Sequence, residues 1–273
     1  MFKAQRRDTV LTRAFTLAEL VYHSTVRNIR KGHATGLRAL LMNILQSVIF
    51  IGAFVVMFTF LGLRGSAIRG DFILYIMSGI FLFMTHVKAM GAMVGAEGPA
   101  SPMMKHAPMN TAIAMLSAAM GSLYIQFLSV VIILFGVHVL WHPIEIQNAG
   151  AAFGMFMIAW FTGAAIGTVL LAMKPWAPNF VQILNSIYSR VNMIASGKMF
   201  VANTLPSSML AFFDWNPLFH CIDQARGFVF VNYNPHHSNW EYPLLFGVVA
   251  LLVGMMGEFY TRRNTSASWF AAR

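Results

Sequence analysis

The chain has 273 residues, of which 58% are hydrophobic and only 10% charged, and its mean hydropathy is +0.63. A soluble globular protein carries roughly 25% charged residues, and a disordered chain combines low hydrophobicity with high charge, so the composition excludes both classes. Because one bilayer span takes about 20 apolar residues, the length allows roughly six spans joined by short loops.

The net charge of +10 comes from 19 Lys and Arg against nine Asp and Glu. Such a charge can indicate nucleic-acid binding, but we expect none, because the basic residues lie between apolar runs and not on one soluble patch. Contact with anionic lipid and the orientation of the loops explain the charge better. The single cysteine, Cys221, excludes an internal disulfide and a cysteine-based metal site. Residues 1–38 lack the pattern expected of a cleavable signal peptide.

Gaps between charged residues predict the membrane spans, because a charge at the middle of a bilayer is costly. They place six spans in chain order, at residues 39–63, 72–90 with a continuation to 95, 111–140, 149–173, 180–201 and 242–259. The fifth is the weakest, since Arg190 and Lys198 interrupt it. Residues 49–58 do not alternate polar and apolar side chains as a β-barrel strand would. We therefore expect an all-α integral membrane protein in which each span is a helix.

The positive-inside rule predicts the orientation. With the N-terminus in the cytoplasm, 14 of the 19 Lys and Arg fall in cytoplasmic segments, so we expect both termini to be cytoplasmic. The chain then divides into an N-terminal segment (residues 1–38), a transmembrane domain (residues 39–260) and a C-terminal tail (residues 261–273).

Two cytoplasmic segments are candidates for contact with a partner. Residues 10–29 contain charges, but their apolar residues recur at helical spacing, which predicts an amphipathic helix on the membrane face. That helix is either a lipid anchor alone or a docking surface. The loop at residues 91–110 holds three prolines, which break a continuous helix. A short helix that begins near Ser101 would suit a partner's groove, and a plain loop is the alternative.

The fifth span and the segment after it are the most informative. Arg190 follows 15 charge-free residues, and an ionisable group near mid-span predicts a functional role; the alternative is a long side chain that reaches the interface. Residues 202–241 are rich in aromatic side chains. We interpret residues 207–213 and 218–230 as two short re-entrant helices in the outer leaflet, whose aromatic residues either contact a sugar or form an interfacial belt.

Motifs that would supply energy or chemistry are missing from the sequence. Gly197 and Lys198 lack the earlier glycine of a P-loop, and no span carries the central carboxylate that ion-coupled transport uses. The adjacent His236 and His237 point in different directions, so we expect no metal site. Gly163-x-x-x-Gly167 permits close helix packing.

Three passages resemble the membrane permease subunit of ABC-2 type transporters, in the branch that exports capsule, O-antigen and other polysaccharides. They are the amphipathic stretch with Arg27, Arg30 and Gly36 leading into Leu40-Leu41-Met42-Asn43, then Ser196-Gly197-x-x-Phe200 followed by Leu205-Pro206, and finally Trp215-Asn216-Pro217-Leu218-Phe219-His220-Cys221-Ile222-Asp223-Gln224-Ala225-Arg226. The third is similar to the family's signature of Asn-Pro-Leu, His, an acidic residue and Arg. The chain departs from the family at residues 40–43, where an aromatic residue and a Glu-Pro pair are common, and at Asp223, where Glu is usual.

The resemblance implies a half-transporter of the bacterial inner membrane, with no catalytic residue and no cofactor on this chain. Two copies would form the pore, and separate ATPase subunits holding ATP and Mg²⁺ would drive it. The implied partners are that ATPase, a second copy, a lipid-linked glycan, membrane lipid and, where export continues outward, periplasmic or outer-membrane proteins. The expected translocation path contains Tyr188, Arg190, Phe212, Trp215, Phe219 and Arg226. The expected ATPase-coupling surface contains Phe15, Tyr22, Glu97, Ser101, Met104 and Lys105.

Two other functions remain open at this point. One is drug or small-molecule efflux by a permease of the same family. The other is a membrane glycosyl or acyl transferase, which would need carboxylate or histidine side chains that converge near one membrane face.

Overall fold

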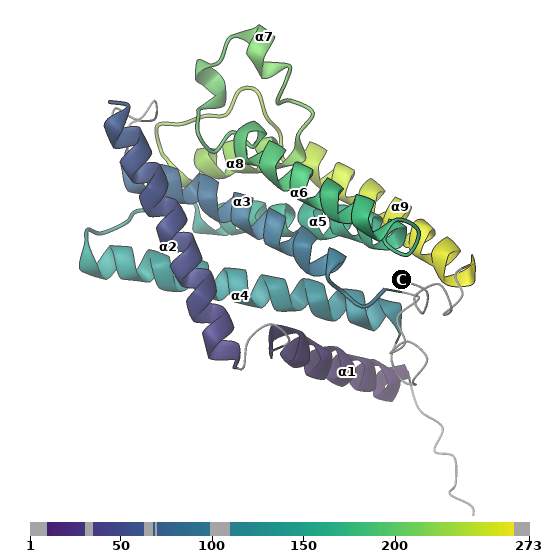
Figure 1. Ribbon diagram of the computed structural model, residues 1–273. Coiled ribbons are helices and arrows are strands. Elements are labelled where there is room, and N and C mark those ends of the chain that lie inside the picture. The colour runs from purple at the N-terminus through teal and green to yellow at the C-terminus, as the bar shows by residue number, and fades with distance from the viewer. Residues whose placement is uncertain (1–9, 31–34, 63–67, 69, 99–109, 265–273) are drawn as a thin grey trace, which may run out of the picture.

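The computed structural model describes residues 10–30, 35–62, 68, 70–98 and 110–264, and this part of the chain is built from helices joined by turns (Figure 1). In chain order the elements are α1 (Val10–Arg30), α2 (Gly36–Phe60), α3 (Phe72–Val94), α4 (Thr111–Leu140), α5 (Ala149–Met173), α6 (Pro178–Ala195), η2 (Ala202–Thr204), α7 (Ser207–Leu210), α8 (Pro217–Val229) and α9 (Glu241–Asn264). Five of the described helices, α2, α3, α4, α5 and α9, are long and apolar enough to cross a membrane. The expected all-α membrane fold is confirmed at that level.

Local capping explains why two helices begin where the sequence predicts. The Asn110 side chain accepts a hydrogen bond from the backbone N–H of Ile113 (2.8 Å), and that of Asn148 accepts one from Ala151 (3.0 Å). An asparagine at this position satisfies an N–H group that has no partner within the helix. Helices α4 and α5 therefore have the predicted bounds, whereas α2 begins three residues before the predicted span, after its cap Thr35.

Helices α3 and α5 form the buried centre of the bundle. In their most apolar windows, 78% of α3 and 67% of α5 is buried, against 17% of α4 and 22% of α9. The two central helices approach closely at Gly163 and Gly167, where an added Cβ would lie 2.2 Å from the carbonyl oxygen of His86 and 2.7 Å from that of Met90. The small-residue pattern thus serves a contact within the chain. Because the contacts advance together along both helices, from Gly163 with His86 to Gly167 with Met90, α3 and α5 run in the same direction.

Helix α9 runs parallel to α5. Gly247 of α9 faces Thr162, and Gly254 faces Thr168, so the contacts advance together along both helices. Since α5 and α9 point the same way, the chain between them has to return along the whole length of the bundle.

Helix α6 makes most of that return. Its first turn, at Val181, packs with Met90 and Val94 near the end of α3. After α6 ends, the Cβ of Lys198 lies 2.8 Å from the Cβ position of Gly79, near the start of α3. Helix α6 is therefore antiparallel to α3, although it is not among the helices apolar enough to be assigned as a span on composition.

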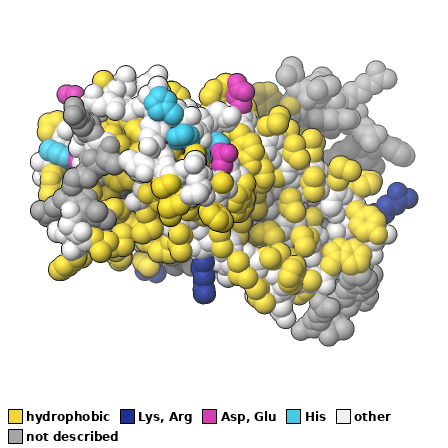
Figure 2. Space-filling model, turned by 90° about the horizontal axis from the view of Figure 1, so that it is seen from above, with side chains coloured by type: hydrophobic (Ala, Val, Ile, Leu, Met, Phe, Trp, Pro, Cys, Tyr) yellow, Lys and Arg dark blue, Asp and Glu magenta, His cyan; other side chains and the backbone are white. Residues whose placement is uncertain are grey.

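Basic residues outnumber acidic ones among the described residues at one end of the bundle, where Glu19, Glu97 and Glu258 also lie, and most of the remaining acidic residues lie at the other end, beside the buried Lys198 and Arg226. The α1 end is where α2 begins and where α3, α5 and α9 finish, as the hydrogen bonds of Lys88 with Gln46 and of Lys174 with Val94 require. At this end lie Arg27, Arg30, Arg38, Lys88, Lys174, Arg262 and Arg263. The opposite α8 end carries Asp71, Glu145, Asp214, Asp223 and Glu241. Figure 2, seen from the α7 side, shows acidic and histidine side chains gathered there.

Of the two short helices predicted before the last span, the first is shorter than expected and the second has the expected 13 residues, shifted by one position. Helix α7 is a single turn, Ser207–Leu210, and α8 runs from Pro217 to Val229. Helix α8 lies against α5 and α3, which gives it a fixed place in the bundle. At the other end, α1 lies along α4 (Figure 1), where Asn28 donates a hydrogen bond to the hydroxyl of Ser117 (2.8 Å).

Candidate functional site

Helix α8 is tied to the end of α6 at its first residue. Asn216 is the N-cap of α8, and its side-chain oxygen accepts from the backbone N–H of Leu218 (3.1 Å). Its amide group donates to the side chain of Asn192 and to the carbonyl of Ala195, each at 2.9 Å. Pro217 follows at the first helical position, where a missing N–H costs nothing. The Asn-Pro pair therefore both starts α8 and fixes it to α6.

Arg226 holds the turn that follows α6. The side chain is 1% exposed, and its guanidinium donates to the carbonyl oxygens of Gly197 (2.9 Å), Phe200 (2.7 Å) and Lys198 (2.8 Å). It also lies 4.2 Å from the ring centre of Tyr75. Planar guanidinium with five donors suits several fixed acceptors at once. Gly197 has φ +76°, and an added Cβ would meet Phe219 at 2.8 Å, so glycine is required in this turn.

The ammonium group of Lys198 lies in a cage of phenylalanine rings. Its Nζ is 3.5 Å from the ring centre of Phe83 and 5.5 Å from those of Phe50 and Phe54. The residue is 2% exposed, and Nζ has no hydrogen-bond partner among the described residues. A cation over an aromatic face is stabilised by the ring quadrupole, most strongly when water is excluded. This contact joins the α6–α8 turn to α2 and α3.

The acidic residue of α8 binds the segment that leads to α9. Asp223 accepts hydrogen bonds from the hydroxyls of Tyr233 and Ser238, the latter at 2.6 Å. Gln224 donates to the carbonyl and hydroxyl of Ser238 (2.8 and 3.0 Å). Burial, and next the Asp223 carboxylate, raises the pKa of the Tyr233 hydroxyl, which therefore stays protonated as a donor.

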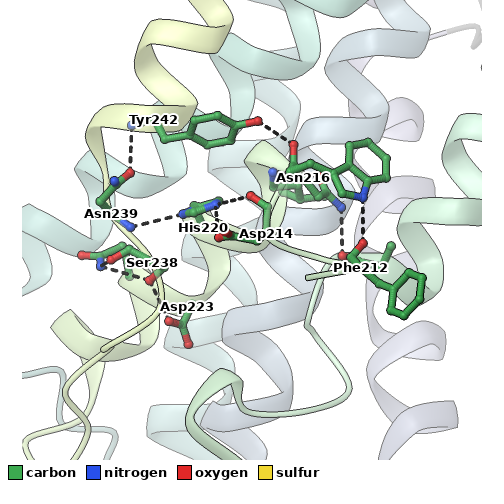
Figure 3. Close-up of polar contacts among 12 residues, drawn as sticks. Phe212, Asp214, Asn216, His220, Asp223, Ser238, Asn239 and Tyr242 are labelled. Atoms are coloured by element: carbon green, nitrogen blue, oxygen red, sulfur yellow. Dashed lines mark hydrogen bonds and ion pairs between the residues drawn. The ribbon is translucent and has the colours of Figure 1, made fainter. Parts of the chain in front are cut away.

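His220 joins both sides of α8 in the same region (Figure 3). Its Nδ1 accepts from the backbone N–H of Asn239 (3.2 Å), so Nε2 carries the proton and donates to the carbonyl of Asp214 (2.7 Å). The hydroxyl of Tyr242 donates to the carbonyl of Trp215 (2.6 Å). The arrangement fixes the loops on both sides of α8 and leaves His220 and Asp223 with their polar atoms already engaged.

The structure separates the residues expected on a translocation path. Phe212 and Trp215 are 73% and 57% exposed at the α8 end, and Arg190 is exposed on α6. Phe219 and Arg226 are each 1% exposed and belong to the packed interior, and their place on a translocation path stays a prediction. They are buried because α8 packs against α3 and α5, and the guanidinium finds its backbone acceptors in the turn after α6.

Tyr188 also points inward. Its hydroxyl donates to Nε2 of His86 (2.9 Å), since Nδ1 of that histidine donates to the carbonyl of Ala159 (3.1 Å). His86 is fully buried and also contacts the hydroxyl of Thr162 (3.0 Å). One histidine thus connects α3, α5 and α6 near the middle of the bundle.

A cavity of about 780 Å³ lies at the α1 end between α1, α2, α3, α4 and α6. We name it the Lys88 cavity. Its polar lining residues are Asn28, Asn43, Gln46, Lys88, Ser122, Gln126, Asn185 and Ser189. Lys88 donates a hydrogen bond of 2.6 Å to the side-chain oxygen of Gln46. Neither Arg190 nor Tyr188 lines this cavity.

The expected coupling residues are only partly within the described chain. Phe15 and Tyr22 of α1 are 75% and 65% exposed. Glu97 is half-buried just after α3. Ser101, Met104 and Lys105, with the short helix predicted there, lie outside the described residues.

Sequence reasoning missed His86 and most residues of the Lys88 cavity. The signal that marks them is the occurrence of polar side chains inside apolar spans, since such groups are costly in lipid and face the bundle interior. The cage around Lys198 has no comparable signal, because its three rings come from two other helices. Neither a protein-family model nor a curated protein matches the chain.

Proposed function

We propose that this chain is the membrane permease subunit of an ATP-driven exporter, which moves a lipid-linked polysaccharide across the bacterial inner membrane. ATP and Mg²⁺ are held by a separate ATPase subunit, and two copies of this chain form the translocation path. Both termini face the cytoplasm in this proposal, and the chain crosses the membrane six times.

The observation that carries the proposal is the character of α6. This helix runs antiparallel to α3 along the bundle, yet it buries only Val181, Asn192 and Ala195. Gln182, Ser186 and Arg190 recur every fourth residue and are exposed, so they form one polar stripe. Polar side chains at membrane depth face water or another protein. A water-filled path or a second copy beside α6 meets that requirement.

The two ends of the bundle support transport from the α1 end to the α8 end. Positive charge gathers at the α1 end, as expected of a cytoplasmic face, and α1 leaves Phe15 and Tyr22 exposed there for an ATPase to contact. The α8 end exposes Phe212 and Trp215, which suit contact with sugar rings because the negative face of an aromatic ring packs against the C–H groups of a sugar.

The transferase alternative has less support. The converging acidic and histidine side chains, Asp223 and His220, are buried and already hydrogen-bonded to Tyr233, Ser238 and backbone groups. A general acid or base has to reach the proton that it transfers, and these groups are occupied in holding loops. Efflux of a small molecule is distinguished from glycan export by the cargo in the assay below.

Reconstitution tests the proposal. The tagged chain is purified from its own cells with the ATPase that accompanies it, and the complex is placed in proteoliposomes with a fluorescent lipid-linked oligosaccharide. We expect ATP-dependent movement of the glycan that stops when the ATPase is removed or its P-loop lysine is replaced. Movement by this chain alone, or movement of drugs but not of the glycan, would contradict the proposal.

A further inference from the structure

The Lys88 cavity has the charge and size of a ligand site that the proposed function does not yet use. We propose that it binds the anionic phosphate headgroup of a membrane amphiphile, with Lys88 as the cation that contacts the phosphate. The inference rests on the proposed export function in one respect, because it names the place where a lipid-linked cargo is held at the α1 end. The binding site itself is tested independently of transport.

The charge of the cavity favours an anion. Among the described residues that line it, Lys88 is the only Lys or Arg, and none is Asp or Glu. The hydrogen bond to Gln46 uses one of the three ammonium protons, and the amide group of Gln46 makes no other hydrogen bond within the described chain. The ammonium group of Lys88 and the amide N–H₂ group of Gln46 can therefore both donate to a phosphate, and the bond from the ammonium group is charge-assisted.

A second set of polar residues gives the cavity a fixed wall. Asn43 donates to Ser129 (2.8 Å) and accepts from Gln126 (3.2 Å), so these side chains are held by one another. Asn185 differs, because its side-chain oxygen is buried and has no partner among the described residues. Such an acceptor is costly without a donor, so this wall carries one polar atom whose partner the described chain does not supply.

Size and position favour an amphiphile over a free ion. A volume of about 780 Å³ is within the range of sites for drug-sized ligands and far larger than a lone phosphate needs. Ile29, Met42, Val87 and Ile125 add apolar wall beside the polar groups. One side is formed by α1, an amphipathic helix of the kind that lies at a membrane surface. A phosphate near this surface would keep its apolar chain in the bilayer.

Arg190, which is expected on the translocation path, lies on the exposed side of α6 and does not line the cavity. Lys88 does line it, so the phosphate contact is assigned to Lys88.

Cysteine protection tests the inference, because the native Cys221 is fully buried and provides a silent background. In Gly91→Cys the new Cβ enters open space within the cavity lining. Ser208→Cys, exposed on α7, is the matched control. Both variants are placed in phosphatidylcholine nanodiscs, and the rate of maleimide labelling is measured with farnesyl phosphate, farnesol, glucose 1-phosphate or added phosphatidylglycerol.

We expect farnesyl phosphate to slow labelling of Gly91→Cys and leave Ser208→Cys unchanged, whereas farnesol and glucose 1-phosphate have no effect. Adding Lys88→Gln should raise the half-protecting concentration by about tenfold, as loss of one charge-assisted hydrogen bond implies, and Lys88→Arg should restore it. If Lys88→Gln is not monodisperse, Gln46→Leu removes the neighbouring donor at an exposed position and should likewise weaken protection by farnesyl phosphate.

Equal protection by farnesol or by glucose 1-phosphate would overturn the inference, and so would protection that does not change in Lys88→Gln. Protection by phosphatidylglycerol as well would support an anion site and assign it to ordinary membrane lipid. Because none of these measurements requires the ATPase, failure of the cavity and failure of the proposed export are distinguishable.

Discussion

Single buried cations fix the most unusual part of this molecule. Arg226 binds the carbonyl oxygens of the turn after α6, and Lys198 projects from that turn onto phenylalanine rings. Both cations already make their contacts within the chain, so neither is offered as a ligand-binding group. Their common effect is to hold α6, α8 and the first half of α3 in one arrangement.

Replacing Arg226 should destabilise the protein, because the buried carbonyl of Lys198 and the part-buried carbonyl of Phe200 have no other donor among the described residues. We expect Arg226→Met to lose about 3 kcal/mol of unfolding free energy and to lower Tm by about 5–10 °C, measured by thermal unfolding in detergent. The exposed Arg190→Met is the matched control and should differ little from the parent. Equal Tm values for the two variants would show that the turn does not depend on the guanidinium.

Cys221 should be unreactive in the folded protein. It is fully buried in α8, and burial raises the pKa of its thiol, so little of the reactive thiolate is present at neutral pH. Maleimide should modify it only after denaturation in SDS, whereas Ser208→Cys should be modified at once. Rapid modification of native Cys221 would mean that α8 is not packed as described.

Arg190 should matter for transport and not for folding. It is exposed on the polar stripe of α6, so Arg190→Ala removes a charge without leaving a cavity. We expect export in proteoliposomes to fall by about tenfold or more, with Arg190→Lys intermediate, while the variant still copurifies with the ATPase at the parental Tm. Parental export by Arg190→Ala would remove this residue from the mechanism.

At the scale of elements, the close contact of α3 and α5 determines how the central helices pack. Gly163 and Gly167 allow the backbones to approach until an added methyl group would overlap the carbonyl oxygens of His86 and Met90. Van der Waals contact of this kind is a main source of association between helices in a bilayer.

Gly163→Ala should therefore be destabilising, by about 1–3 kcal/mol, because the central helices have to separate. Gly154→Ala lies in the same helix, where an added Cβ meets no atom within 4 Å, and should be neutral or slightly stabilising. Thermal unfolding of the two variants in the same detergent gives the comparison. A neutral Gly163→Ala would contradict the packing of α3 on α5.

The helices differ in how far the sequence predicts them. Charge-free stretches located α4 and α5 in the sequence, and the structure shows that Asn110 and Asn148 cap their starts. Helix α6 has no such signal at its end: it finishes at Ala195, and Lys198, which interrupts the predicted span, is placed by rings on α2 and α3. The Lys88 cavity likewise depends on five elements meeting, which no stretch of sequence encodes alone.

At the scale of the whole molecule, the directions of the helices determine which ends share a side. Helices α3, α5 and α9 are parallel, and α2 is antiparallel to α3, as the contacts of Gln46 with Lys88 and of Phe58 with Phe72 show. The start of α2 and the end of α9 therefore lie at the same end of the bundle (Figure 1). Because α5 and α9 are parallel, α6 and the turn after it have to bring the chain from the α1 end back to the α8 end before α9 begins.

We propose above all that α6 crosses the membrane. The chain then makes six crossings, with the α1 end in the cytoplasm and the α8 end outside. Labelling of Ser208→Cys and Arg263→Cys in spheroplasts with an impermeant maleimide tests it most directly, because the buried Cys221 stays silent. The account predicts that Ser208→Cys is labelled in intact spheroplasts and Arg263→Cys only after the membrane is opened. Labelling of Arg263→Cys from outside would contradict it.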